Sequence, residues 1–238
     1  MNKTRQFMNK VLQPVTTLDQ DQLHQLEEYL KLVLEVNQGK NLTAITDWEE
    51  AVVKHLYDSL IVMHWAQWSQ QTRILDLGSG AGFPGLPLAI ANPQKTFYLL
   101  EANKKKANFL LQATEDLQLK NTVVLNERAE ILAHQAPHRS RYHLVTARAV
   151  AATAVLLELA VPFCQTEGWF LAYKGRNYQE EVNGASKALE ILGVDLSQEF
   201  HYELPHALGS RALLFFRKNR ETPVRYPRRP GIPGKRPL

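Results

Sequence analysis

Residues 73–88, RILDLGSGAGFPGLPL, decide how this chain is expected to fold. A short apolar run contains Asp76 and is followed by glycines at positions 78, 80, 82 and 85. Glycine has no Cβ, so its backbone turns tightly at a strand end and comes close to a ligand that a side chain would exclude. The stretch therefore predicts a strand, a turn that binds a nucleotide-like cofactor, and a helix.

The spacing of these glycines fits two kinds of cofactor site. Gly80-x-Gly82-x-x-Gly85 matches the dinucleotide-binding pattern, whereas Asp76-x-Gly78-x-Gly80-x-Gly82 resembles motif I of S-adenosylmethionine (SAM) methyltransferases. Asp76 favours the second, because SAM brings no pyrophosphate to the helix N-terminus and a carboxylate is tolerated there. A purely structural turn is the alternative for a glycine cluster taken alone.

The rest of the chain alternates between strand-like and helix-like segments. Strands are predicted at residues 73–77, 96–101, 122–126, 142–147, 168–173, 197–204 and 211–217. This alternation predicts an α/β fold with a doubly wound, mostly parallel sheet. The last two strands are too close in sequence for a crossover helix, so one strand should be antiparallel. Seven strands with one antiparallel strand make the class I SAM-dependent methyltransferase fold, whereas the dinucleotide fold lacks that strand.

Helices are predicted before the sheet. Apolar residues recur at helical spacing from Leu23 to Leu34, and Gly39 is expected just past the end of that helix. Asp47, with Glu50 three residues later, resembles a capping box that opens a second helix. We expect a helical segment packed on a SAM-binding core and followed by a basic, proline-rich tail, at residues 1–68, 69–221 and 222–238.

Positive charge is concentrated in that tail. The tail carries a formal charge of +5, whereas the whole chain carries +4, so the rest of the chain carries −1. Its five prolines argue against a helix or a central strand, and we expect an extended, mobile tail that the sheet does not need. Arginine binds phosphate and stacks on bases, which favours RNA, and a merely solvated terminus is the alternative. The predicted RNA contacts are Arg225, Arg228, Arg229, Lys235 and Arg236.

Composition argues against several other classes of protein. The single cysteine, Cys164, allows no internal disulfide or cysteine-based metal site, and we expect it to be a small buried hydrophobe. The longest apolar run, residues 149–157, is too short to span a bilayer. We expect a cytoplasmic monomer with no membrane contact and no metal ion.

A second cofactor contact is predicted at Glu101. It ends an apolar strand about twenty residues after the glycines, where an acid accepts hydrogen bonds from the ribose hydroxyls of NAD or SAM. The alternative is an acid that begins the next helix, which Asn103 could cap.

Six short motifs occur in a fixed order along residues 37–217. They are Asn41-Leu42-Thr43, HLYDSL at 55–60, GFPG at 82–85, Arg128-Ala129-Glu130, Arg148-Ala149 and Lys174-Gly175. The ordered set resembles the small-subunit ribosomal RNA methyltransferase G family, also called the glucose-inhibited division protein B family. The resemblance implies a class I fold, SAM as cofactor, and methylation of N7 of one guanine in 16S ribosomal RNA, either free or in the small subunit.

Carried over by position, the resemblance implies SAM contacts at Gly78, Phe83, Glu101, Ala129, Glu130 and Arg148. Phe83 would offer an apolar wall, and the Ala129 amide with Glu130 would read the adenine edge. Gly80 joins the set because a side chain there would enter the cofactor space. Arg148 follows an apolar strand at the edge where open α/β sheets bind ligands. It could hold the SAM carboxylate or RNA, with an ion pair to Glu158 or Asp76 as the alternative.

Methylation of guanine N7 requires alignment more than a base, because N7 has an exposed lone pair and no proton. A donor on N7 would block the nucleophile, so the enzyme must hold O6, the Watson–Crick edge or the base face. Arg148 and Lys174 are the predicted catalytic positioning residues, and strand-end packing is the alternative. Lys54 and Asp58 have the spacing of an ion pair on a helix surface.

Two other functions stay open. An NAD-binding oxidoreductase would use Gly80, Gly82 and Gly85, although no acid or base for hydride transfer stands out. A non-catalytic RNA-binding or ribosome-assembly protein could retain the cofactor fold.

Overall fold

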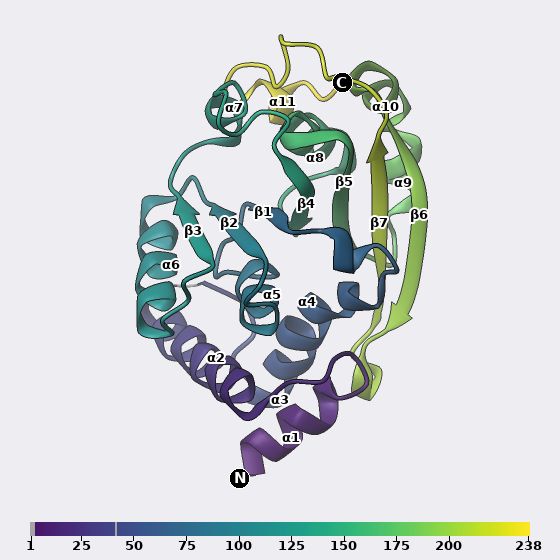
Figure 1. The fold of residues 1–238 in the computed structure, drawn as a ribbon. Coiled ribbons are helices and arrows are strands. Elements are labelled where there is room, and N and C mark those ends of the chain that lie inside the picture. The colour runs from purple at the N-terminus through teal and green to yellow at the C-terminus, as the bar shows by residue number, and fades with distance from the viewer. Residues whose placement is uncertain (1–2, 41) are drawn as a thin grey trace.

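The computed structural model describes residues 3–40 and 42–238 (Figure 1). Asn41, in the first family motif, lies outside the described residues. One sheet of seven strands, in the order β3-β2-β1-β4-β5-β7-β6, forms the centre. Its strands are β1 (Arg73–Leu77), β2 (Thr96–Leu100), β3 (Thr122–Leu125), β4 (Tyr142–Arg148), β5 (Cys164–Gly175), β6 (Val194–Glu203) and β7 (Ser210–Lys218). β7 is antiparallel to β5 and β6, whereas the other neighbours are parallel, which confirms the predicted topology.

Two apolar clusters lie on the two faces of the sheet. Successive strand residues point to opposite faces, so Ile74 belongs to one cluster and Leu75 to the other. The first is covered by α5 (Gly85–Ala91) and α6 (Lys104–Asp116). The second is covered by α7 (Ala129–Leu132), α8 (Thr153–Ala160) and α10 (Ser186–Leu192), while α9 (Gln179–Asn183) follows β5. None of the helices in the described part of the chain combines the length and apolar character needed to cross a membrane.

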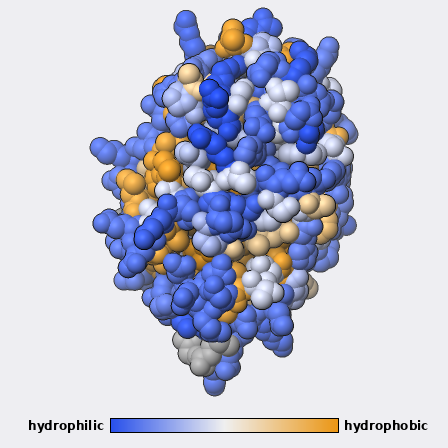
Figure 2. All heavy atoms as spheres, in the orientation of Figure 1, coloured by the Kyte–Doolittle hydropathy of each residue, from blue (hydrophilic) through white to orange (hydrophobic). Residues whose placement is uncertain are grey.

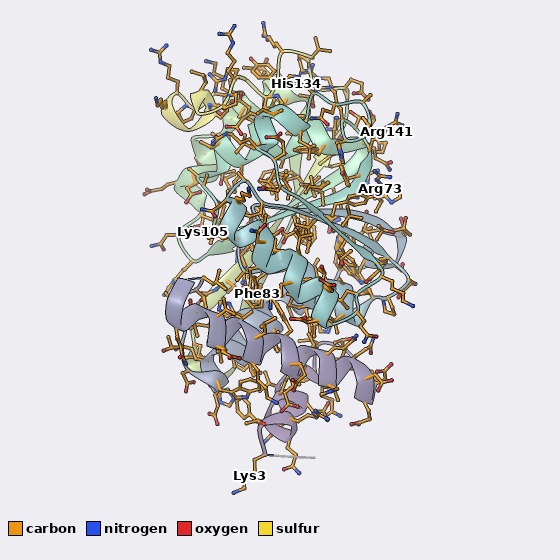
Figure 3. The ribbon with its side chains drawn as sticks, turned by 90° about the vertical axis from the view of Figure 1, so that its left-hand side faces the viewer. Lys3, Arg73, Phe83, Lys105, His134 and Arg141 are labelled. Atoms are coloured by element: carbon orange, nitrogen blue, oxygen red, sulfur yellow. The ribbon has the colours of Figure 1, made fainter. Side chains whose placement is uncertain are left out.

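The helices before the sheet pack against the apolar cluster that contains Ile74. They begin with α1 (Lys3–Leu12) and α2 (Gln20–Lys40), and Figure 3 turns α2 and α6 toward the viewer. Leu26 and Tyr29 of α2 are fully buried in the cluster that contains Ile74. Gly39 lies inside α2, so the predicted helix end before Gly39 is wrong. Its φ is not in the left-handed range that a glycine cap adopts.

The second predicted helix begins as expected but does not continue regularly. Asp47 caps α3 (Trp48–Ala51), and its Oδ1 accepts a hydrogen bond from Glu50 N at 2.8 Å. A π-helical turn, η1 (Val52–Tyr57), then leads into α4 (Asp58–Leu60) and the 3₁₀ turn η2 (Ile61–His64). The wider turn changes the helical phase. Lys54 pairs with Glu50 four residues earlier, and Asp58 is buried and pairs with Arg148, so the predicted surface pair of Lys54 with Asp58 is wrong.

The tail is folded onto the body, at the end of the molecule that carries α7 and α8 (Figure 1). The Arg139 guanidinium donates to the carbonyl oxygens of Tyr226 and Thr222 at 2.9 Å each, and Tyr226 is buried. A short helix, α11 (Ile232–Lys235), accommodates Pro233 in its first turn, where a missing N–H is tolerated. The expectation of an extended tail separate from the body is therefore wrong.

Candidate active site

The glycine loop between β1 and α5 has a backbone that favours glycine at several positions. Gly78, Gly80 and Gly82 have φ values of +70°, +59° and +102°, in the region that side chains rarely adopt. A Cβ on Gly85 would lie 2.9 Å from Asp76 Oδ2. The glycines are thus required by the shape of the loop and by its close packing.

Asp76 holds this loop from inside the protein. Its Oδ1 accepts a hydrogen bond from Thr146 Oγ1 at 2.9 Å, and its Oδ2 accepts one from Gly85 N at 3.2 Å. Burial raises the pKa of this carboxyl to about 6. Asp76 therefore ties β1 to β4 and to the start of α5.

A cavity of about 360 Å³ lies beside the loop, and we call it the cofactor cavity. It is bounded by the segments that follow β1, β2, β3 and β4, at the carboxyl edge where such sheets bind ligands. Its lining includes five of the predicted cofactor residues, namely Gly78, Gly80, Glu101, Ala129 and Glu130.

Glu101 is oriented in this cavity by backbone amides. Its Oε2 accepts from Gly80 N at 2.9 Å, and its Oε1 accepts from Asn103 N at 2.7 Å. Each carboxylate oxygen has a second lone pair that can accept from a ribose hydroxyl. The cap of α6 is Asn103 itself, whose Oδ1 accepts from Lys105 N at 2.9 Å. Glu101 is thus left at the cavity wall.

Glu130 connects the cofactor cavity with the tail. Its Oε1 accepts from Arg128 Nη2 at 2.7 Å and from Gly231 N at 3.0 Å. Burial opposes the charged form, but these donors outweigh it and hold the pKa of Glu130 below its usual value. Beside it, the Ala129 N–H makes no hydrogen bond within residues 3–40 and 42–238.

Phe83 lies beneath the loop and lines neither this cavity nor the one described next. Its ring stacks on His55, with centroids 4.3 Å apart, and the Arg148 guanidinium carbon is 5.1 Å from its centre. The Tyr29 hydroxyl donates to Ala81 O at 2.6 Å, so α2 also supports the loop. A direct contact of Phe83 with a cofactor stays a prediction.

A second cavity, of about 700 Å³, adjoins the first, and we call it the basic cavity. The two share Ala149 and Val150, which follow β4. Its charged lining residues are Lys54, Asp58, Arg148, Lys174, Glu181 and Arg211. The chain therefore places a nucleoside-sized cavity directly beside one rich in cations.

Arg148 is held in the basic cavity by the irregular helix. Its Nη1 donates to Asp58 Oδ2 at 3.0 Å and to Lys54 O at 3.1 Å. Its partner is therefore Asp58, and neither Glu158 nor Asp76 forms the ion pair considered from the sequence. Burial and the nearby Arg148 charge lower the pKa of His55 to about 3, so this ring is neutral at pH 7.

Lys174 also lines the basic cavity. Its Nζ donates to Glu181 Oε2 at 2.6 Å and to Ala151 O at 3.2 Å. The hydroxyl of the preceding residue, Tyr173, instead donates to Ser59 O in the interior. Sequence reasoning missed Glu181 and Arg211, because both come from segments with no recognisable motif.

The tail cations separate into two groups. Arg228 donates through Nε and Nη2 to Glu158 at 2.8 and 2.6 Å, and Glu158 is fully buried. Arg228 is therefore used within the protein, which argues against the predicted RNA contact there. Figure 2 shows that the end of the molecule with the tail is mainly hydrophilic. The exposed tail cations are Arg225, Arg229, Lys235 and Arg236.

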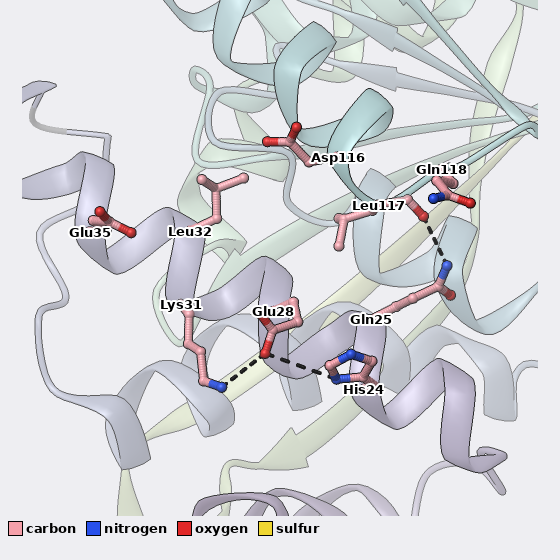
Figure 4. A pocket seen from close by; sticks show the side chains of 9 residues that line it. All are labelled: His24, Gln25, Glu28, Lys31, Leu32, Glu35, Asp116, Leu117 and Gln118. Carbon is pink, nitrogen blue, oxygen red and sulfur yellow. Dashed lines mark hydrogen bonds and ion pairs between the residues drawn. The ribbon is translucent and has the colours of Figure 1, made fainter.

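A hollow of about 540 Å³ elsewhere does not belong to this site (Figure 4). It lies between α2 and the end of α6, at the amino edge of the sheet, because α6 starts at the carboxyl edge. Two of its charged side chains pair with each other, with Lys31 Nζ 2.9 Å from Glu28 Oε1. Cys164 is fully buried, as the sequence predicts, and burial raises the pKa of its thiol to about 12.

Comparison with known proteins agrees with this geometry. The family described as rRNA small subunit methyltransferase G matches residues 22–206. A protein named Ribosomal RNA small subunit methyltransferase G from Halalkalibacterium halodurans is 40% identical over 233 residues, 98% of either chain. Its namesake from Pelotomaculum thermopropionicum is 43% identical over 221 residues, 93% of this chain and 92% of its own.

Solved structures support the fold independently. A protein of Klebsiella pneumoniae assigned as an O-methyltransferase aligns with a TM-score of 0.56 over 92% of this chain and 100% of its own, at 14% identity. A methyltransferase assigned in Bacillus halodurans C-125 aligns with a TM-score of 0.51 over 69% of this chain and 100% of its own, at 15% identity. These likenesses show the class I methyltransferase fold alone. The sequence relatives go further, and with matches over nearly its full length the chain belongs to the rRNA small subunit methyltransferase G family.

Proposed function

We propose that this protein transfers a methyl group from SAM to N7 of a guanine in 16S ribosomal RNA. The observation that carries the proposal is the shared wall of Ala149 and Val150 between the cofactor cavity and the basic cavity. One cavity has the carboxylate and amides suited to a nucleoside, and the other has the cations suited to RNA. A methyl group at the wall would need to travel only between neighbouring cavities.

The residues of the cofactor cavity fit SAM. Glu101 would accept from the ribose hydroxyls, while the Ala129 N–H and the Glu130 region would meet the adenine edge. Gly80 leaves space beside the loop, since no side chain lies within 4 Å of the position that its Cβ would take, whereas a Cβ on Gly78 would lie 2.8 Å from Val150 Cγ2 in the shared wall. Bound there, SAM would supply an electrophilic methyl group.

The chain has little chemistry to perform beyond alignment. Guanine N7 carries its own lone pair, so no side chain has to remove a proton first. Arg148 is fixed by Asp58 and Lys54, and Lys174 is fixed by Glu181, so both cations are pre-oriented at the cavity wall. They would hold RNA phosphate, a base carbonyl or the SAM carboxylate without moving.

The exposed tail cations would extend the contact to the RNA backbone. Arg225, Arg229, Lys235 and Arg236 are exposed on the same segment whose Gly231 reaches Glu130 at the cofactor cavity. RNA bound by the tail would thus lie near the cofactor. Residence in the cytoplasm as a monomer stays a prediction.

One binding measurement and one activity measurement distinguish the proposal from the alternatives. Calorimetry with SAM and with NAD tests the cofactor, and binding of NAD alone would favour an oxidoreductase. Transfer of label from methyl-labelled SAM to small subunits tests catalysis, and SAM binding without transfer would favour a non-catalytic RNA-binding protein.

A further inference from the structure

Glu181 occupies a defined position in the basic cavity. It lies on α9, which follows β5 and contributes no residue to the cofactor cavity. Its Oε2 accepts three hydrogen bonds, from Lys174 Nζ at 2.6 Å and from both N and Oγ1 of Thr153 at 3.1 Å. Thr153 begins α8, so two separate elements fix the carboxylate.

The other oxygen of this carboxylate remains available. No hydrogen bond between described residues uses Glu181 Oε1, and the side chain is 39% exposed. Partial burial opposes the charged form, but the donors from Lys174 and Thr153 outweigh it and keep the pKa of Glu181 below its usual value. The basic cavity therefore presents an ionised acceptor at neutral pH.

Asp58, the other carboxylate of this cavity, is not available in the same way. Its Oδ2 accepts from Arg148 Nη1 at 3.0 Å, and its Oδ1 accepts from the Tyr202 hydroxyl at 2.8 Å. Asp58 is also buried, whereas Glu181 reaches solvent. Of the two acids, Glu181 is therefore the one placed to meet a ligand.

The chemistry of N7 methylation restricts how guanine can be recognised. N7 must stay free, because a donor bound to N7 would occupy the lone pair that receives the methyl group. The adjacent Watson–Crick edge of guanine presents two donors, N1–H and the exocyclic amine. Adenine has an unprotonated N1 there, which a carboxylate oxygen would repel.

We propose that Glu181 selects guanine by accepting a hydrogen bond through Oε1 from the exocyclic amine on the Watson–Crick edge of the base. This inference rests on the proposed N7 methylation, and it makes Glu181 a specificity-determining residue. Lys174 and Thr153 hold Oε2, so the carboxylate meets the base without a conformational search. The acceptor also leaves N7 and O6 untouched.

The test compares guanosine with inosine at the methylated position of reconstituted small subunits. Inosine keeps N7, O6 and N1–H but lacks the exocyclic amine. A lost hydrogen bond to a charged group should lower kcat/KM of the wild type by about tenfold or more. In the Glu181→Gln variant the amide NH₂ should face the base, because Lys174 and Thr153 require an acceptor, so the preference for guanosine should disappear or reverse. Glu180→Gln, an exposed neighbour outside the cavity, should retain the wild-type ratio.

Three results would overturn the inference. The first is an equal kcat/KM of the wild type for inosine and guanosine. The second is an equal loss of activity of Glu181→Gln on both substrates, which is expected if Glu181 only orients Lys174. If the variant is too slow to assay, filter binding measures the ratio of its affinities for guanosine-containing and inosine-containing subunits. A ratio equal to that of the wild type refutes the role of Glu181. A wild type that binds SAM but methylates neither subunit would instead refute the proposed function.

Discussion

Replacing Arg228 with alanine tests whether the tail is part of the folded body. Glu158 is fully buried, and Arg228 gives it hydrogen bonds from N and Nε at 2.8 Å and from Nη2 at 2.6 Å. Alanine keeps the backbone N–H but removes both side-chain donors. A buried carboxylate is then left without its compensating charge.

The expected loss of stability follows from this burial. Removing one partner of a buried ion pair costs about 3–5 kcal/mol. The Arg228 side chain is 27% exposed, so water can reach the vacated space and we expect the lower end, about 3 kcal/mol. For a protein of this size, each kcal/mol lowers Tm by about 2–4 °C, which gives a fall of roughly 6–12 °C.

Thermal unfolding of the purified variant measures this change, with Arg229→Ala as the matched control. Arg229 is exposed and forms no ion pair with the described residues, so its replacement should alter stability by less than about 0.5 kcal/mol. Equal Tm values for the two variants would refute the anchoring of the tail by Arg228 and Glu158.

Other predictions concern the loop, the basic cavity and the tail. Because burial raises the pKa of Asp76 to about 6 from about 4 when unfolded, its contribution to the free energy of unfolding should fall by up to roughly 3 kcal/mol as pH rises through that window. Urea unfolding of the wild type and Asp76→Asn at pH 4 and pH 7 measures this change. The wild type should lose stability relative to the variant between pH 4 and pH 7, and a constant difference would contradict the raised pKa of Asp76. Arg148→Ala should lower both methyl transfer and stability, the latter by about 3 kcal/mol because Asp58 is buried, and a loss of activity at unchanged Tm would show that the ion pair is not structural. Replacing the four exposed tail cations by alanine should lower the slope of log affinity for RNA against log salt by up to about 2.8, at ~0.7 per phosphate, with SAM binding unchanged. Deleting residues 222–238 should weaken SAM binding as well, because Glu130 loses the Gly231 N–H; calorimetry checks this, and unchanged affinity would contradict the coupling.

Features set by short-range patterns could be predicted from the sequence. The strand positions followed from apolar runs, and the antiparallel strand followed from the short connection before β7. The cofactor cavity was partly predictable, because Gly78, Glu101 and Ala129 all end or follow strands at one edge. Local sequence is enough when the fold itself brings strand ends together.

Features that depend on distant partners could not be predicted. The tail was expected to be extended because its prolines oppose regular structure, but Arg139, Glu130 and Glu158 supply acceptors and donors from remote segments. The π-helical turn also has no sequence signature, so the burial of Asp58 beside Arg148 was missed. Such contacts are decided by packing rather than by periodicity.

The most direct test of the central claim is mass spectrometry of 16S ribosomal RNA from cells that lack this gene. Loss of 7-methylguanosine at one position, restored by the wild-type gene but not by Gly80→Asp, is the predicted result. Gly80 borders the cofactor cavity, so a carboxylate there should exclude SAM. Unchanged 7-methylguanosine in cells lacking the gene would contradict the account.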